Sequence, residues 1–389
     1  MIQNLSIQAP TYVSIMWALI LLVSSRANKA RFFLGIFMFA VFMIFLSHVV
    51  YFNHWKEIYL YFDLVFIFAS LSIFPIYYWY IKLLTFQPRI GFKDMKHLIP
   101  AFLMLIAAIV TYSFMSKHLR AVYVNDYLYG DGRMENAPML IKIQLILCYT
   151  LQVIYFIQIV FAFVKIRAHI SKYNENIANY YSNLEDKTLE WHKLILYSFV
   201  GSSVFTVYTN FMGRSFFDKW PIMLLFACIA YSVFLFGLGY LGYMQNHSIE
   251  LFEKEIQLVP EKEVKAESNS KIKTQLLTLF EKEQIYKQKE LKITDVVTML
   301  STNRTYISTF INQEFACSFS TFVNRYRVEA AKKILMDESC NKLCLEHISS
   351  EVGFGSLHSF IRVFKEIEGT TPGRFRETMT NTQTNKMAV

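Results

Sequence analysis

The chain has 389 residues, of which 54% are hydrophobic, 17% are aromatic and only 18% are charged. Soluble globular chains carry about 25% charged residues, so this deficit indicates that much of the chain lies in lipid. The 13 glycines and 8 prolines exclude collagen and extended disorder, and the five cysteines, which have no regular spacing, exclude a disulfide scaffold.

Charge divides the chain into two parts. Residues 1–270 contain 22 Lys or Arg and 17 Asp or Glu, a net charge of +5, whereas residues 271–389 contain 17 and 13, a net charge of +4. The second part has nearly half of the basic residues in less than a third of the length, and it has no long apolar run. The sequence therefore predicts an apolar N-terminal part and a basic, soluble C-terminal part.

Long apolar runs recur through residue 245, and a helix of about 20 apolar residues can cross a bilayer. We therefore predict an all-α chain in which residues 1–245 form a seven-helix transmembrane sensor domain, with six or eight crossings as alternatives. The expected spans are 5–25, 32–52, 58–86, 98–115, 139–164, 194–213 and 221–245.

Basic residues orient these spans. With the N-terminus outside, the inside loops hold eleven Lys or Arg residues and the outside loops hold six. Cytoplasmic loops carry the excess of Lys and Arg, so seven crossings place the C-terminus in the cytoplasm. The first ten residues contain no basic residue, unlike a cleavable signal peptide, so we interpret 5–25 as a retained span.

Few ionisable residues lie within the expected spans. His48, Asp63 and Lys142 fall near the outer ends of their helices, where Asp63 and Lys142 could pair and, with His48, line a sensor pocket. The alternative is that these side chains extend to the lipid headgroups. The region contains no HExxH, no GxSxG and no glycine-rich phosphate loop, so we expect no catalytic residue and no cofactor.

Residues 246–274 are expected to connect the two parts. Apolar residues between positions 249 and 259 have the spacing of a short two-stranded helical seam, which would suit a homodimer. An amphipathic helix that lies on the membrane is the alternative. Pro260 ends this helix, and the charged, polar residues 261–270 are typical of a flexible tether.

The basic part has helical periodicity throughout, beginning with a helix near 275–287. The next helix has a buried face made of Ile293, Val296, Val297 and Leu300. Residues 301–303 break it and supply a capping residue for a second helix, whose apolar residues are Ile307, Phe310 and Ile311. Its polar outer face consists of Thr305, Ser308, Thr309 and Asn312. This order is typical of a helix-turn-helix unit.

The pattern returns after a long helix at about 319–337. A short helix at 345–352 precedes a turn at Gly353-Phe354-Gly355, where glycine can adopt the left-handed backbone conformation. Ser356 can cap the following helix, and Gly369 can end it. The residues expected to face inward are Leu357, Phe360, Phe364 and Ile367. The residues expected to face outward are His358, Arg362 and Lys365.

Over about 275–378 the sequence resembles the AraC family of transcription regulators. The segments that carry the resemblance are TYISTFINQEF, SFSTFVNRYRVEAAKKIL and EVGFGSLHSFIRVFKEIEGTTPGRFR. Two residues depart from the family pattern: Ala316 stands where Gly is usual after the first recognition helix, and Ser349 where Ala is usual before the second turn. Residues 379–389 are expected to form a polar tail.

This resemblance implies sequence-specific binding to promoter DNA. Arg362 is the best candidate for reading a base, because arginine can bind guanine through two hydrogen bonds. The DNA-binding candidates are Thr305, Ser308, Thr309 and Asn312 in the first unit and His358, Ile361, Arg362 and Lys365 in the second. The expected partners are double-stranded DNA, the lipid bilayer, a second copy of the chain, an unidentified small-molecule or peptide signal and RNA polymerase.

Together these features predict a one-component transcription regulator in the cytoplasmic membrane of a bacterium. One alternative is a transporter or membrane enzyme with an attached DNA-binding regulatory domain. Another is a latent factor that proteolysis in the linker releases. Cys340, Cys344 and His347 lack a fourth ligand, so no metal site is expected there.

Overall fold

The computed structural model describes residues 2–25, 28–85, 90–130, 132–185, 187, 200–201, 204, 216–217, 220–244, 269–337 and 343–387. These residues are mostly helical and contain no strand, only an isolated antiparallel bridge between Tyr181 and Lys292. The expected all-α class is thus confirmed for them. The chain divides into unit 1, Met1–Ser171 with Glu190–Phe252, and unit 2, Lys172–Leu189 with Glu253–Val389.

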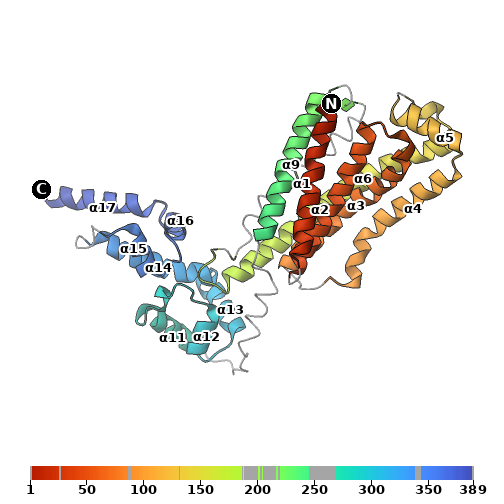
Figure 1. The fold of residues 1–389 in the computed structure, drawn as a ribbon. Coiled ribbons are helices and arrows are strands. Elements are labelled where there is room, and N and C mark those ends of the chain that lie inside the picture. The colour runs from red at the N-terminus through yellow and green to blue at the C-terminus, as the bar shows by residue number, and fades with distance from the viewer. Residues whose placement is uncertain are drawn as a thin grey trace. The chain divides into compact units, whose positions relative to one another are not determined.

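The described residues of unit 1 form six long helices (Figure 1). They are α1 (Ile2–Val23), α2 (Lys29–Phe52), α3 (Lys56–Thr85), α4 (Ile99–Phe114), α6 (Met139–Ala178, whose last seven residues belong to unit 2) and α9 (Pro221–Met244). Four short elements precede or follow α4 in the chain: η1 (Phe92–Leu98), α5 (Lys117–Val122), η2 (Tyr123–Leu128) and η3 (Met134–Asn136). Six helices of the described chain are long and apolar enough to cross a membrane.

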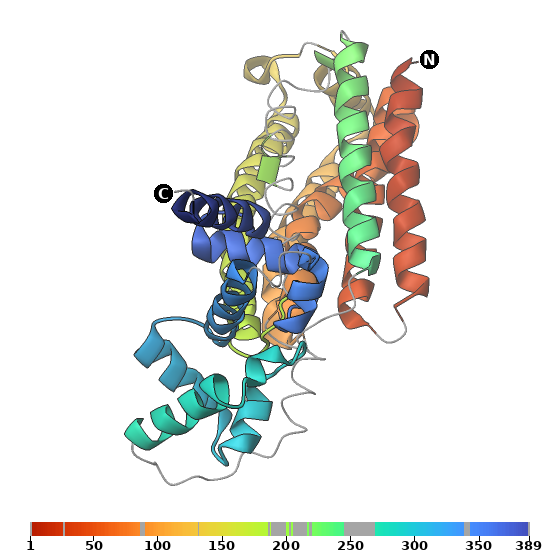
Figure 2. The same cartoon turned by 90° about the vertical axis from the view of Figure 1, so that its left-hand side faces the viewer.

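Helices α9, α1, α2 and α3 pack side by side in that order, as Figures 1 and 2 show. Glycines allow the close approach. A Cβ at Gly239 of α9 would lie 2.4 Å from the Trp17 ring of α1, and one at Gly242 would lie 2.1 Å from Leu34 of α2. Such small residues let the backbones of membrane helices come together and gain van der Waals contact.

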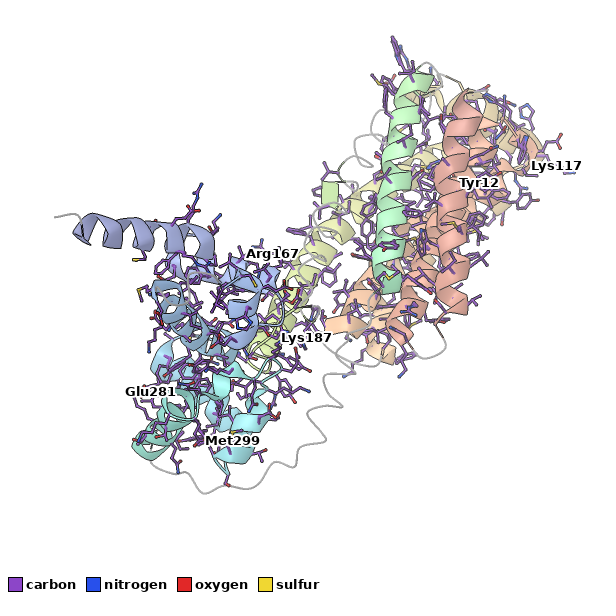
Figure 3. All side chains as sticks on the ribbon, turned by 60° about the vertical axis from the view of Figure 1, so that its left-hand side comes forward. Tyr12, Lys117, Arg167, Lys187, Glu281 and Met299 are labelled. Carbon is purple, nitrogen blue, oxygen red and sulfur yellow. The ribbon has the colours of Figure 1, made fainter. Side chains whose placement is uncertain are left out.

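The outer surfaces of these helices are apolar. Tyr12 of α1, labelled in Figure 3, is 64% exposed, and Leu103 of α4 and Val153 of α6 are also exposed. A soluble protein rarely exposes a large contiguous apolar surface, whereas hydrocarbon chains can cover one. The surface therefore fits the expectation that unit 1 lies in lipid.

The helices of unit 1 coincide with six of the expected spans. The remaining span, 194–213, and the connecting helix at 246–260 lie outside the described residues, apart from positions 200–201 and 204. The main difference is α6, which continues from the expected end at 164 to Ala178. The apolar side chains of Ile166, Ile170, Tyr173 and Ile177 recur at helical spacing and are at most 1% exposed. Their burial favours continuation of the helix.

The described residues of unit 2 form eight further elements. They are α11 (Asn269–Glu281), η4 (Ile285–Lys287), α12 (Ile293–Met299), α13 (Arg304–Phe315), α14 (Phe319–Met336), α15 (Leu345–Glu351), α16 (Leu357–Glu368) and α17 (Pro372–Met387). The central helix α14 contacts η4, α13, α15, α16 and α17. Helix α11 begins and ends about six residues before the expected positions, and α17 continues into the expected polar tail.

Candidate nucleic-acid interface

Helices α12 and α13 are joined by a tight turn. Val296 is buried on α12, and the backbone reverses at Ser301, which has a φ of 50°. Asn303 then caps α13 by accepting a hydrogen bond from the Tyr306 amide, 2.7 Å away. A cap of this kind satisfies one of the free N–H groups at the start of a helix. The expected turn and capping residue are thus present.

The outer face of α13 is polar and accessible. Ile307, Phe310 and Ile311 are buried, as the periodicity predicts. On the opposite side, three candidates are exposed and one is half-buried; in chain order they are Thr305, Ser308 (half-buried), Thr309 and Asn312. This face presents short hydroxyl and amide groups, which form hydrogen bonds with phosphates or base edges.

Helices α15 and α16 are joined by a turn that requires glycine. Gly353 has a φ of 91°, and a Cβ there would lie 2.6 Å from the carbonyl oxygens of Tyr286 and Lys287. Ser356 then caps α16 by accepting a hydrogen bond from the Ser359 amide, 3.2 Å away. Gly369, with a φ of 75°, ends the helix as predicted.

The inner face of α16 differs from the expectation at its last turn. Phe360 and Phe364 are buried, but Ile367 is 37% exposed, and Val363 is buried in its place at 6%. The reason is geometric, because Val363 and Phe364 lie three and four residues after Phe360 and face the core together. The core that they share contains Val328, Ala331, Leu335, Ile348, Val352, Phe354, Phe360, Val363, Phe364 and Phe375.

The outer face of α16 carries the basic candidates. His358, Arg362 and Lys365 are exposed, and Ile361 is half-buried. The Arg362 guanidinium lies 3.9 Å from the Glu366 carboxylate, and both side chains are more than half exposed. An exposed pair at this distance contributes less than about 1 kcal/mol, so the guanidinium can leave it for a base or a phosphate.

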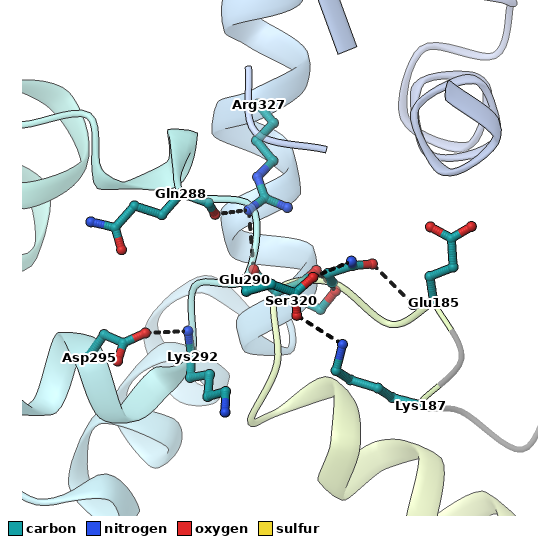
Figure 4. A network of polar contacts seen from close by, with 10 residues as sticks. Glu185, Lys187, Gln288, Glu290, Lys292, Asp295, Ser320 and Arg327 are labelled. Atoms are coloured by element: carbon teal, nitrogen blue, oxygen red, sulfur yellow. Dashed lines mark hydrogen bonds and ion pairs between the residues drawn. The ribbon is translucent and has the colours of Figure 1, made fainter. Parts of the chain in front are cut away.

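A buried arginine that the sequence does not reveal lies at the centre of unit 2 (Figure 4). Arg327 of α14 is 1% exposed, and its guanidinium donates to the carbonyl oxygens of Tyr286 at 2.8 Å and Gln288 at 2.7 Å. It also donates to Ser182 Oγ at 3.2 Å and lies 5.6 Å from the Phe354 ring centre. Burial lowers the pKa of Arg327 to about 10, so it is charged at neutral pH.

The two departures from the family pattern have distinct local consequences. Ala316 ends α13 in the left-handed conformation, with a φ of 50°, a conformation that glycine adopts without strain. Ser349 is 2% exposed, and its hydroxyl donates to the Ser356 carbonyl oxygen at 3.2 Å. The extra hydroxyl is therefore satisfied and ties α15 to the start of α16.

In unit 1, Asp63 is joined to tyrosines. Its carboxylate is buried and accepts hydrogen bonds from Tyr59 at 3.1 Å and Tyr112 at 2.7 Å. The Gln144 amide donates to the Tyr112 hydroxyl at 2.9 Å, so polar contacts connect α3, α4 and α6. Among the described residues, no ion pair joins Asp63 to Lys142, which is half-buried.

His48, the third residue of the predicted sensor pocket, is surrounded by rings. Its imidazole centre lies 5.3 Å from that of Phe66 and 6.2 Å from that of Phe45. The structure thus shows aromatic contacts for His48 and a tyrosine network for Asp63.

No group of three or more His, Cys, Asp or Glu side chains that could hold a metal occurs in the described part of the chain. Cys340 lies outside that part, Cys344 is exposed, and His347 lies 3.8 Å from Glu351 one helical turn away.

Comparisons with known proteins agree with this geometry. A family model described as a helix-turn-helix domain matches residues 296–378. The chain is also similar to two uncharacterized helix-turn-helix-type transcriptional regulators of Bacillus subtilis (strain 168). YtdP is 31% identical over 90 residues, 23% of this chain and 11% of that protein. YfiF is 36% identical over 86 residues, 22% of this chain and 26% of that protein.

Two solved structures are also similar to the chain. One is the C-terminal domain of AraT, a response regulator from Geobacillus stearothermophilus, with 25% identity, a TM-score of 0.24, and coverage of 28% of this chain and 84% of that chain. The other is the C-terminal domain of the two-component response regulator YesN from Fusobacterium nucleatum, with 26% identity, a TM-score of 0.24, and coverage of 28% and 99%.

The C-terminal part of the chain is thus a helix-turn-helix domain of the AraC type. The chain spans about a tenth to a quarter of the length of the curated relatives that it matches.

Proposed function

We propose that this chain is a membrane-embedded one-component transcription regulator that binds duplex DNA through two helix-turn-helix units, α12–α13 and α15–α16. The observation that carries the proposal is the pair of exposed polar faces on α13 and α16. Both helices pack against the same central helix, α14. Two such units about one DNA turn apart, roughly 34 Å, can enter successive major grooves.

The two helix-turn-helix units present different chemical groups. The α13 face offers hydroxyl groups and one amide, which suit phosphate oxygens, whereas the α16 face offers an imidazole, a guanidinium and an ammonium group. Phosphate contacts supply affinity, and contacts to base edges supply specificity. We therefore assign most of the base recognition to α16.

Unit 1 is proposed to hold the regulator in the cytoplasmic membrane with its N-terminus outside. Six candidate spans support membrane insertion, and the excess of Lys and Arg in alternate loops supports the orientation. Unit 2 would then meet DNA in the cytoplasm, where two chains acting as a dimer would contact two half-sites.

Selection from a random duplex library by the purified full chain in lipid nanodiscs tests DNA binding directly. We expect enrichment of one sequence and an affinity that falls steeply as salt rises, because phosphate contacts release bound cations. Recovery of a library with unchanged composition would contradict sequence-specific binding.

Signal sensing is proposed to involve the Asp63 network. A ligand shifts an equilibrium only if it binds one arrangement more tightly. The contacts of Tyr112 with Asp63 and Gln144 connect α3, α4 and α6, helices that such a shift would move. We expect Asp63→Asn to change expression from a reporter that carries the selected site, although this residue of α3 lies outside the helix-turn-helix units.

The exposed Asp126 offers a matched control, since Asp126→Asn removes the same charge outside the network. Equal reporter expression from the wild type and both variants would exclude Asp63 from sensing.

A further inference from the structure

We propose that residues 180–185, together with Lys187, form a docking segment that competes with DNA for the start of helix α16. The segment belongs to unit 2, although it follows α6, which begins as a candidate membrane span. The inference rests on the proposed DNA-binding function and adds to it an occupant for the DNA-binding surface within the same chain.

The docking segment pairs with the backbone that leads into α12. The Ser182 amide donates to the Leu291 carbonyl oxygen at 3.0 Å, and the Ile293 amide donates to that of Tyr180 at 2.9 Å. These two bonds flank the antiparallel bridge between Tyr181 and Lys292. Paired backbone groups of this kind fix the register of the segment against the first helix-turn-helix unit.

Side chains from α14 secure the segment at its centre. Ser182 is 2% exposed; its carbonyl oxygen accepts a hydrogen bond from Ser320 at 3.1 Å, and its hydroxyl accepts one from Arg327 at 3.2 Å. Tyr180 and Tyr181 are also 2% exposed. Two buried tyrosines with satisfied backbone partners indicate a packed interface rather than a loop that rests on the surface.

Glu290 holds the far end of the segment, as Figure 4 shows. Its carboxylate accepts hydrogen bonds from the Asn183 amide at 2.8 Å and from the Lys187 ammonium at 3.0 Å. Burial raises the pKa of Glu290, but these two bonds lower it by more, so the carboxyl is ionised at neutral pH. Charge-assisted bonds of this kind are stronger than neutral ones.

From this anchored position the segment reaches the second helix-turn-helix unit, at the start of α16. Ser356, the capping residue, donates its hydroxyl hydrogen to the Glu185 carboxylate at 2.9 Å. Asn183 lies so close to the preceding turn that a Cβ at Gly355 would be 2.4 Å from its amide nitrogen. Two residues of the segment therefore cover the turn and the residue that caps the helix.

The covered end is the N-terminal end of α16, which is the end expected to contact DNA. A recognition helix enters the major groove with its N-terminal residues foremost, and the free N–H groups there attract phosphate oxygens. Glu185 places a negative charge at that end, where it occupies the Ser356 hydroxyl and repels phosphates. The Arg362 side chain, six residues further along, stays exposed, so docking blocks the start of α16 without covering its whole outer face.

The position of the segment in the chain links this competition to unit 1. Helix α6 is continuous from Met139 to Ala178, and the segment begins two residues later. A change at the end of α6 therefore acts directly on the docking segment, which is either docked on the two helix-turn-helix units or free. Release of the segment would open α16 to DNA.

One test removes the charge that covers α16. Glu185→Gln, in the full chain in nanodiscs, should bind the duplex selected from the library about tenfold more tightly than wild type, because one charge-assisted bond and one repulsive charge are lost. Glu175→Gln is the matched control, since Glu175 is exposed on the preceding helical turns. Equal gains in affinity in both variants would show that the effect comes from the net charge alone, and would overturn the proposal.

A second test locks the segment in place. In a chain whose five native cysteines are replaced by serine, Asn183→Cys with Gly355→Cys places two thiols within reach, because the shorter side chain at 183 leaves room for a Cβ at 355. Oxidation should form the disulfide and weaken duplex binding at least about tenfold, reduction should restore binding, and prior addition of duplex should slow the crosslinking.

The outcomes separate the two proposals. A crosslinked chain that binds duplex as tightly as the reduced chain would overturn the competition and leave the proposed function intact. Failure of the crosslink to form would overturn the docking itself. A reduced chain that binds no duplex at all would remove the proposed function, and this inference with it.

Discussion

Ala316 shows how a single residue can be strained without disturbing the fold. It holds a left-handed backbone at the exposed end of α13, which costs an alanine about 1 kcal/mol relative to glycine. We expect Ala316→Gly to raise the local free energy of unfolding by about that amount. Hydrogen exchange of α13 and α14 amides in the full chain, followed by mass spectrometry, measures it.

The opposite result is expected for an alanine within a helix. Ala330 lies in the interior of α14, so Ala330→Gly should lower the same free energy by about 1 kcal/mol. If both substitutions to glycine destabilise the unit, the backbone conformation of Ala316 does not carry strain.

Arg362 is the residue on which base recognition depends most. Its exposed guanidinium has the two-pronged geometry that guanine accepts in the major groove. Arg362→Ala should therefore cost about 1–3 kcal/mol of binding free energy at one base position and relax specificity there. Binding to a set of duplexes, each with one base pair of the selected site changed, measures the effect.

Lys365 supplies the contrast on the same helix. Lys365 is an exposed ammonium group suited to phosphate. Lys365→Ala should therefore weaken binding to all duplexes alike and reduce the number of cations released on binding by about one. A uniform loss from Arg362→Ala instead would assign Arg362 to the phosphate backbone.

Local signals in the sequence predicted single residues well. Asn303, Ser356 and Gly369 act at helix ends through bonds to residues within four positions, and a chemical preference of that range is visible in the sequence. Arg327 could not be found in this way, because its partners Gln288 and Ser182 lie 39 and 145 positions away. Periodicity alone cannot separate it from the other basic residues of α14, which are exposed or half-buried.

At the scale of elements, Arg327 connects parts of unit 2 that share no helix. Its bonds to the carbonyl oxygens of Tyr286 and Gln288 hold η4 against α14, while its guanidinium lies over the Phe354 ring in the second turn. Arg327→Met fills a similar volume but leaves these carbonyl oxygens unpaired. We expect a loss of about 3 kcal/mol in the local stability of η4 and α14, measured by hydrogen exchange.

The same helix contains a matched control. Arg325 is exposed on α14, two residues earlier, and Arg325→Met should change the stability by no more than about 0.5 kcal/mol. Similar losses from both variants would show that Arg327 contributes general helix packing and not the connection between η4 and the second turn.

Element boundaries were predictable where polar caps mark them and less so elsewhere. The apolar run predicts a span that ends at 164, yet the buried stripe from Ile166 to Ile177 continues the helix. The stripe has the 4-3-4 spacing of a helix, so the signal was present in the sequence. The pairing of residues 180–182 with 291–293 was not, since nothing local specifies a partner over a hundred positions away.

At the scale of the whole molecule, the number of crossings decides whether the DNA-binding domain can reach DNA. The described residues contain six candidate spans, and the expected seventh, 194–213, rests on the sequence. With the N-terminus outside, six crossings would leave the C-terminus outside as well, whereas seven would place it in the cytoplasm. The excess of eleven basic residues over six in alternate loops favours the second arrangement.

Cysteine labelling in whole cells distinguishes these arrangements. Cys344 is exposed at the start of α15, and Asp126→Cys would place a thiol at an exposed position between α4 and α6. In chains with only one of these cysteines, a membrane-impermeant maleimide should label position 126 in intact cells and Cys344 only after the membrane is permeabilised. Labelling of Cys344 in intact cells would place the helix-turn-helix domain beyond the membrane, out of reach of the chromosome, and a regulator that acts on promoters would then be excluded.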